Sequence, residues 1–421
     1  MSVVPFTLSA QENAPPRQGG LGTVHFETSC DPAVGAVFDR AIALLHSFEF
    51  GSAVSTFDEV LAADPDCAMA WWGIALSHWG NPMVPNIRPA AQLERGREAA
   101  DAGRRLAARA TERERAYLAA VATLYADHAT RDQRERVLAY EAAMRALAAR
   151  FPEDTEAKIF HAISLVGAAP PTDKSYANQR QAGAELERLF ALQPNHPGLA
   201  HYIIHSYDVP ALASGAATAA RRYASIAPAA AHALHMPSHT FTRVGMWTES
   251  VATNLRSMEA AMRDSSIAEA LHAADYAVYA NLQMRRDSAA RALIARIPEL
   301  AARFDPAVAR GAAPGSAGVF ALAAMPARYA LERGEWAEAA VLEPTTSAFP
   351  YAEALTHFAR ALGAAHIGDT ASARRAIDSL EAIRVRLDAA HEAYWAEQVA
   401  IERLGAQAWL ELSLGRQDSA L

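Results

Sequence analysis

Residues 51–76 read GSAVSTFDEVLAADPDCAMAWWGIAL, and this stretch decides the fold. The small residue Ala53 is followed four residues later by the aromatic Phe57, and Pro65 comes eight residues after that. Residues four apart share one face of a helix, whereas a proline is poorly tolerated in a helix interior. After the proline, Trp71 opens a second apolar pattern with helical spacing. The stretch therefore predicts two packed helices joined by a short turn.

The same pattern returns at three places further along the chain. The copies combine small and large apolar residues at helical spacing with a following proline. They are residues 139–157, 182–202 and 215–235, with Pro152, Pro194 and Pro228. Towards the C-terminus, Gly334 and Gly368 stand at turns between further helical patterns. From about Ala33 to the C-terminus the chain thus resembles the tetratricopeptide repeat (TPR) superfamily. The resemblance implies an all-α fold, a right-handed α-solenoid of stacked helix hairpins with a concave groove.

These patterns divide the chain into three parts. We expect residues 1–24 to form a flexible N-terminal arm, because this segment is rich in Pro, Gly and Gln. Residues 25–304 are predicted to form the TPR-like solenoid. Residues 305–421 are predicted to form a C-terminal TPR-like helical block that continues the solenoid beyond a boundary near Asp305.

The composition limits the possible functions. About half of the residues (51%) are hydrophobic, and the net charge is −8. Such a charge is mild for the length and indicates neither nucleic acid nor an anionic membrane as partner. No apolar run is long enough to span a bilayer. Since the first twenty residues show no signal-peptide pattern, we expect a cytoplasmic protein, although a chain trimmed of an export signal would look similar.

The two cysteines bear on the same question. Cys30 and Cys67 each fall just before the first helix of consecutive units in the repeat register. A disulfide between them is conceivable in an exported protein, and two reduced thiols would fit a cytoplasmic one. The sequence leaves both alternatives open.

Two histidine pairs are separated by the TPR period. His201 and His205 lie four residues apart, and His235 and His239 repeat this spacing thirty-four residues later, which is the length of a TPR unit. In the register implied by the resemblance, these four residues and His232 occupy groove-facing positions on the first helices of neighbouring units. The two pairs are therefore expected to lie side by side.

A third helix continues the series at residues 269–283, EALHAADYAVYANLQ. His272 and Tyr276 have the same spacing of four, and Tyr279 follows one turn later. We expect Tyr276 or Tyr279 to act in catalysis by hydrogen bonding to a substrate or to a bound oxygen species.

The sequence leaves open the roles of three further residues near the histidines. Asp208 and Asp275 are either acceptors for imidazole N–H groups or charges at helix ends. Pro237 lies between His235 and His239, where it either disturbs a helix or begins a new one. In the second case, the spacing of four would no longer bring this pair together.

Six histidines on three neighbouring helices predict a metal centre. The predicted ligands are His201, His205, His232, His235, His239 and His272. First helices of stacked units pack at ~8–10 Å, so their histidines can converge as three ligands to each of two ions. A site rich in imidazole and poor in carboxylate favours copper, with zinc or iron as alternatives. The ligand pattern alone is similar to that of two-copper oxygen-binding proteins.

The sequence therefore predicts a metal-dependent enzyme, an oxidoreductase that uses copper and acts on a small molecule or peptide in the groove. Zinc would indicate hydrolysis by a metal-activated water instead. Two alternatives from other classes remain: a non-catalytic TPR scaffold that binds a protein partner, and a metal carrier. Neither nucleic acid nor a membrane is expected as a partner.

Overall fold

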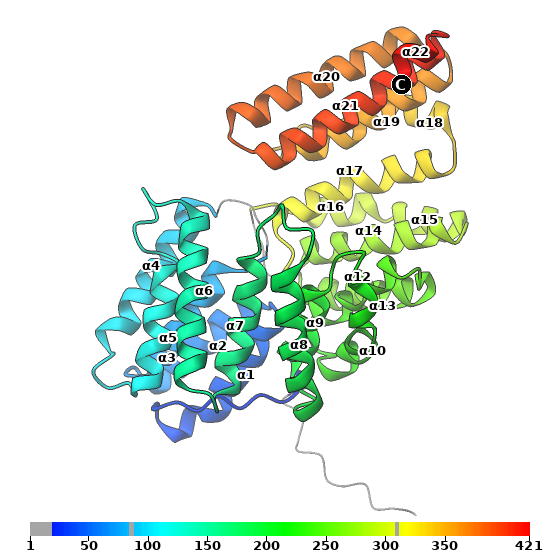
Figure 1. The fold of residues 1–421 in the computed structure, drawn as a ribbon. Coiled ribbons are helices and arrows are strands. Elements are labelled where there is room, and N and C mark those ends of the chain that lie inside the picture. Colours follow the sequence, from blue (N-terminus) through cyan, green and yellow to red (C-terminus); the bar gives the residue numbers. More distant parts are fainter. Residues whose placement is uncertain (1–18, 84–87, 308–310) are drawn as a thin grey trace, which may run out of the picture.

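The computed structural model describes residues 19–83, 88–307 and 311–421, and its helices stack one after another along the chain (Figure 1). Within these ranges there is no β-strand, and most helices pack mainly against their neighbours in sequence. Packing between successive helix pairs is what defines a solenoid. The predicted all-α, TPR-like solenoid of stacked hairpins is confirmed.

The first half of the solenoid is drawn in blue to green in Figure 1. Its helices are η1 (Pro32–Val34), α1 (Gly35–His46), α2 (Phe50–Ala63), α3 (Ala68–Trp79), α4 (Ala90–Arg105), α5 (Glu112–Thr123), α6 (Gln133–Arg150), α7 (Thr155–Gly167), α8 (Ala177–Leu192) and α9 (Pro197–Ser206). They share one core with residues up to Phe241. The middle of the chain contains η2 (Ala213–Ala216), α10 (Ala217–Ile226), α11 (Ala231–His235), α12 (Pro237–Arg243), α13 (Trp247–Arg263), α14 (Ile267–Gln283), α15 (Asp287–Ile294) and α16 (Ile297–Arg303).

The prolines of the repeated pattern mark the turns between helices, as predicted. Each lies two residues after the end of one helix and three residues before the start of the next; they are Pro65, Pro152, Pro194 and Pro228. The repeat register therefore places α9 and α11 at equivalent points of successive units, which aligns the two histidine pairs.

The C-terminal part contains α17 (Gly315–Glu332), α18 (Trp336–Ala340), α19 (Pro350–His366), α20 (Thr370–Ala389), α21 (Ala393–Ser413) and α22 (Gln417–Ala420). Helix α17 packs against α14, and its Ala321 and Met325 belong to the core of the middle part. Helices α19 to α21 form a separate core. The stack thus continues past the region of Asp305 through α17. No helix of the described residues combines the length and apolar character needed to cross a membrane.

The N-terminal segment lies across the ends of the solenoid helices. Of the arm predicted over residues 1–24, residues 1–18 lie outside the described residues. The remainder is packed: Leu21 and Val24 are buried, and the backbone N–H of Thr23 donates to the carbonyl of Asn195 at 3.0 Å. Further along, Cys30 and Cys67 are joined by a disulfide, so of the two alternatives the structure contains the bonded one. The bond ties this segment to the start of α3.

The end of α1 closes over the histidine-bearing helices. Helix α1 contacts α9, and Phe48, two residues after the end of α1, is buried. Gly198 on α9 permits this approach, because a Cβ atom there would stand 2.5 Å from Nδ1 of His46. The solenoid therefore brings the first unit against the unit that carries His201.

Candidate metal centre

The six histidines expected to bind metal lie together in the structure, as two groups of three. The first triad is His201, His205 and His232, from α9 and α11; the second triad is His235, His239 and His272, from α11, α12 and α14. Within each triad, one potential ligand atom from each residue lies within 4.8 Å of the other two. The structure thus brings the six predicted ligands together in two sets of three histidines.

In the first triad, three imidazole Nε2 atoms are buried without a hydrogen-bond partner among the described residues. The opposite nitrogens of two of them are anchored. Nδ1 of His201 lies 2.6 Å from the backbone carbonyl oxygen of His46, and Nδ1 of His232 lies 3.0 Å from Glu269 Oε1. Since a carbonyl or carboxylate oxygen only accepts, each Nδ1 carries the proton and each Nε2 presents a lone pair. Metal-ligating histidines are characteristically anchored in this way.

Burial favours the neutral form of the His201 and His205 side chains. It lowers the pKa of His201 and of His205 well below 6.5, and neighbouring imidazoles lower both pKa values further. Neutral imidazole is the form that binds metal.

Aromatic packing covers the first triad and corrects the expectation that these histidines look into an open groove. The ring of Phe48 lies 4.4 Å from that of His201, 5.6 Å from that of His205 and 5.8 Å from that of His232, between centroids. His201 has no exposed surface. The repeat register gave the correct helix face, but the first unit folds back and fills the groove at this point.

Pro237 begins a new helix, α12, directly after α11. The predicted consequence, separation of His235 from His239, is wrong. Met236, between the two helices, keeps right-handed helical backbone angles (φ −52°, ψ −35°), so the chain turns almost as one helix. The Nε2 atoms of His235 and His239 lie 3.0 Å apart.

The second triad is anchored as the first one is. Nδ1 of His235 lies 2.7 Å from the side-chain oxygen of Asn254, and Nδ1 of His239 lies 2.8 Å from Asp208 Oδ2. Asp208 also accepts from Nε of Arg243. Burial alone would raise the pKa of the Asp208 carboxyl. The neighbouring His239 and Arg243 lower this pKa to about 2, so the carboxylate is charged. Burial lowers the pKa of His272 to about 4 and that of His235 well below 6.5.

The two triads adjoin each other. The ring centroids of His232 and His235 are 6.0 Å apart, and those of His205 and His239 are 6.3 Å apart. Tyr276 covers the second triad: its ring stacks on His239 at 5.1 Å and meets His235 edge-on at 4.9 Å. The six imidazoles therefore form one continuous cluster.

An open pocket of about 460 Å³ reaches the second triad at His239 and His272. Tyr276 and Tyr279, the tyrosines expected to be catalytic, also line it. No residue of the first triad does. A molecule in this pocket would meet the second triad and the two tyrosines.

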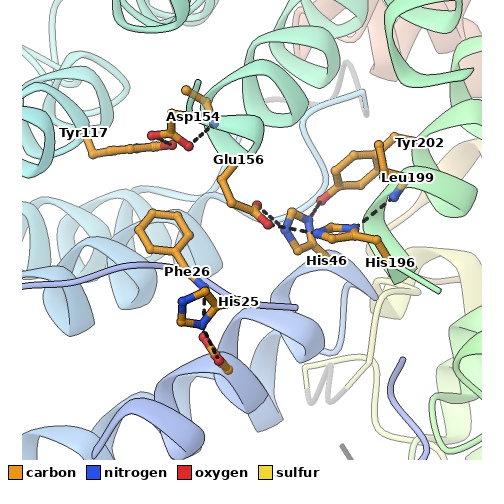
Figure 2. A network of polar contacts seen from close by, with 11 residues as sticks. His25, Phe26, His46, Tyr117, Asp154, Glu156, His196, Leu199 and Tyr202 are labelled. Carbon is orange, nitrogen blue, oxygen red and sulfur yellow. Dashed lines mark hydrogen bonds and ion pairs between the residues drawn. The ribbon is translucent and has the colours of Figure 1, made fainter. Parts of the chain in front are cut away.

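A third cluster lies beside the first triad, and Figure 2 shows His46 and His196 both directed at Glu156. The distances are 2.9 Å from His46 Nε2 and 2.8 Å from His196 Nε2 to the carboxylate. The backbone N–H of Leu199 donates to Nδ1 of His196 at 3.3 Å, so the proton of this ring lies on Nε2 and points at Glu156. Because that nitrogen is a donor, the cluster is a hydrogen-bonded network and not a ligand set.

Sequence reasoning missed several of the anchoring residues. Glu269 had a signal, because it stands three residues before His272 on the same helix. Asn254 had none, because a single asparagine on α13, the helix after α12, forms no pattern with His235. The carbonyl of His46 had none, because it lies 155 residues from His201. Asp208 fulfils the predicted acceptor role, whereas Asp275 pairs with Arg328 instead.

Comparison with known proteins gives only distant likeness. No family model matches the chain, and no curated protein matches it either. Among solved structures, the human IFIT1 dimer with m7Gppp-AAAA aligns with a TM-score of 0.39 and 12% identity over 92% of this chain and 88% of that chain. The APC/C hetero-tetramer Cut9-Hcn1 aligns with a TM-score of 0.34 and 12% identity, over 92% of this chain and 76% of that chain. The structure of Naa15/Naa10 bound to HypK-THB aligns with a TM-score of 0.30 and 13% identity, over 91% of this chain and 64% of that chain. The fold assignment above rests on the helices of this chain itself.

Proposed function

We propose that this chain is a metal-dependent oxidoreductase that uses copper, with the two histidine triads as its ligands. One observation carries the proposal: the Nε2 atoms of the neighbouring residues His201, His205 and His232 are buried and have no hydrogen-bond partner among the described residues. A buried polar atom without a partner is costly, by ~1–3 kcal/mol for each group. Three such atoms at one point are accounted for if a cation binds them.

The donor set favours copper over the alternatives. All six ligands are imidazoles, and the nearby carboxylates of Glu269 and Asp208 are hydrogen bonded to the outer nitrogens of the rings. Imidazole sites suit copper, zinc and iron, and copper has the highest affinity of the divalent first-row ions. Bound copper would supply one-electron redox chemistry; bound zinc would supply a Lewis acid and an activated water.

The chain's own residues give the two triads different roles. The first triad is sealed by Phe48, so we assign it to holding an ion that substrate does not touch. The second triad opens to the pocket, where His239 and His272 would face the substrate. Tyr276 lies against both histidines, and burial raises the pKa of its hydroxyl, which keeps it a neutral hydrogen-bond donor.

Elemental analysis of untagged protein purified without chelator tests the proposal. We expect up to two equivalents of copper per chain in the wild type and loss of metal in the double variant His201→Ala/His235→Ala. The matched control is His161→Ala, a partly buried histidine outside both triads. Zinc or iron in place of copper would redirect the reaction class.

Two other results would favour the rival functions. Bound copper without turnover of any oxidisable small molecule would indicate a metal carrier. Only trace metal, unchanged in the double variant, would contradict the metal site and leave a protein-binding scaffold as the better explanation.

The disulfide bears on the compartment. Disulfides persist in oxidising compartments and are rare in the cytosol. We infer from the Cys30–Cys67 bond that the chain works outside the cytosol, in place of the cytoplasmic location expected from the sequence. Fractionation of the native source, with the thiols blocked at lysis, would test this: two free thiols in a cytosolic fraction would contradict it.

A further inference from the structure

The pocket beside the second triad has a composition that points to a class of substrate. It is lined by α12 and α14 on the histidine side and by residues of α17, α19 and α21 on the other. The C-terminal helices therefore contribute half of a pocket whose reactive side belongs to the solenoid core. The inference drawn from it below concerns the same site as the proposed function and rests on that function.

One wall of the pocket is aromatic. Trp395 stacks on Tyr351 with ring centroids 3.9 Å apart and an angle of 5° between the planes. The ring centroid of Phe320 lies 6.5 Å from that of Trp395, and Tyr279 also lines the pocket. Flat aromatic surfaces of this kind favour a planar, apolar ligand body.

Two arginines stand in the same pocket. Arg328 forms an ion pair with Asp275 through Nη1, and its guanidinium carbon lies 5.5 Å from the centroid of the Tyr279 ring. Arg243 pairs with Asp208 through Nε. About a third of each arginine side chain is exposed, at 33% and 36%. Each pairing engages one nitrogen, and a guanidinium has five N–H donors.

In the pocket, the charges of Arg243 and Arg328 are balanced by those of Asp208 and Asp275. A divalent ion on the second triad would then make the pocket positive. Arginine binds carboxylates through two parallel hydrogen bonds, so a carboxylate is the anion that the remaining N–H donors of Arg328 suit.

We propose that the pocket binds a small aromatic carboxylate, with the ring against Trp395 and Tyr351 and the carboxylate on Arg328. In this placement the ring lies between the aromatic wall and the imidazoles of His239 and His272. The arginine fixes the orientation of the molecule, and the aromatic wall selects its shape.

Isothermal titration calorimetry with simple probes tests this directly. The probes are benzoate, cyclohexanecarboxylate and benzyl alcohol, each titrated into metal-free and zinc-loaded full-length protein. We expect benzoate to bind about tenfold more tightly than either of the others, because only benzoate has both recognition elements. Equal affinity for benzoate and benzyl alcohol would overturn the inference.

Two substitutions test whether benzoate binds in this pocket. Arg328→Gln and Trp395→Leu should each weaken benzoate binding by about tenfold or more. The control Arg384→Gln, at an ion pair on the surface of α20, should leave it unchanged. Since Arg328→Gln leaves the buried Asp275 without its partner and could unfold the chain, Arg328→Lys is the second variant; it retains the charge but loses the two-point fork. Unchanged benzoate affinity in folded Arg328→Lys would overturn the assignment.

The experiments test the metal hypothesis and the pocket hypothesis independently of each other. Benzoate binding that depends on Arg328 in protein without metal affinity would support the pocket and remove the proposed oxidoreductase. Metal binding by the triads without benzoate binding would do the reverse.

Discussion

The backbone carbonyl oxygen of His46 accepts a hydrogen bond of 2.6 Å from Nδ1 of His201, across 155 residues of sequence. The side chain of His46 is itself held by Glu156 and by the hydroxyl of Tyr202 at 3.1 Å (Figure 2). The network around Glu156 thus fixes the carbonyl that selects the tautomer of His201. A buried cluster without ligand atoms of its own supports the first triad in this way.

Displacing His46 should therefore weaken the first triad. In Gly198→Ala, the new methyl group would meet the His46 ring at 2.5 Å. We expect a loss of ~1–3 kcal/mol in the free energy of unfolding, because the site is fully packed. Weaker metal binding should accompany it. Chemical denaturation and metal titration measure the two effects.

Gly35→Ala is the matched control, because a Cβ atom at Gly35 meets no other atom within 4 Å. Alanine is also the better helix former, so the stability of this variant should not fall. Equal behaviour of the two variants would contradict the role assigned to His46.

Glu269 should contribute to metal affinity without touching the ion. Replacing it by glutamine retains an acceptor for the backbone N–H of Ala313 but removes the charge opposite His232 Nδ1. Changes of this kind typically lower metal affinity 10–100-fold. Competition with a chelator of known affinity measures the change. The exposed residue Glu259 provides the control Glu259→Gln; a similar loss in both variants would show that the overall charge is responsible.

The sequence predicts the histidine geometry well because the geometry is local and periodic. His201 and His205 share a helix face, and the repeat length carries that face to His235 and His239. What the sequence could not give is contact between distant segments: Phe48 over the first triad, or Arg328 and Trp395 around the pocket. These contacts depend on how far the solenoid folds back on itself, which no local pattern encodes. Pro237 shows a related limit, because a local rule predicted a break that the backbone at Met236 avoids.

The metal-free protein should lose stability in mild acid. Burial lowers the pKa of His272 from 6.5 to about 4 and also lowers those of His201, His205 and His235. Between pH 6.5 and about 4 the unfolded chain therefore binds more protons than the native chain, so the free energy of unfolding falls as pH falls. Each such histidine contributes a slope of up to ~1.4 kcal/mol per pH unit.

Urea unfolding at several pH values in this window measures the slope. In His272→Gln it should be shallower by up to ~1.4 kcal/mol per pH unit. Glu49 has the opposite effect on stability. Burial raises the pKa of its carboxyl to about 8, so its contribution to the free energy of unfolding is lost as pH rises from 4.5 towards 8. Comparing Glu49→Gln with the wild type separates the two contributions. A slope unaffected by His272→Gln would contradict the assignment.

The disulfide should stabilise the fold without affecting the metal. Cys30 and Cys67 are 37 residues apart, and a closed loop of that size contributes ~3–4 kcal/mol. The double variant Cys30→Ser/Cys67→Ser should therefore unfold at a lower denaturant concentration and retain its metal stoichiometry. Loss of metal in this folded variant would show that the N-terminal segment helps to build the triads.

Two ions bound at the two triads should leave at different rates. His239 and His272 line the open pocket, whereas the Nε2 atoms of the first triad are buried behind Phe48. A chelator mixed with loaded protein should remove one equivalent quickly and the second at least about tenfold more slowly, because the second requires a local opening of the structure.

Phe48→Leu should shorten only the slow phase of metal release. The smaller side chain covers less of the first triad, and the substitution leaves the pocket unchanged. Trp395→Leu, on the opposite wall of the pocket, should not slow the fast phase. A single phase with both equivalents lost together would mean that the triads are equally accessible. In that case the division into a sealed ion and a substrate-facing ion would have to be abandoned.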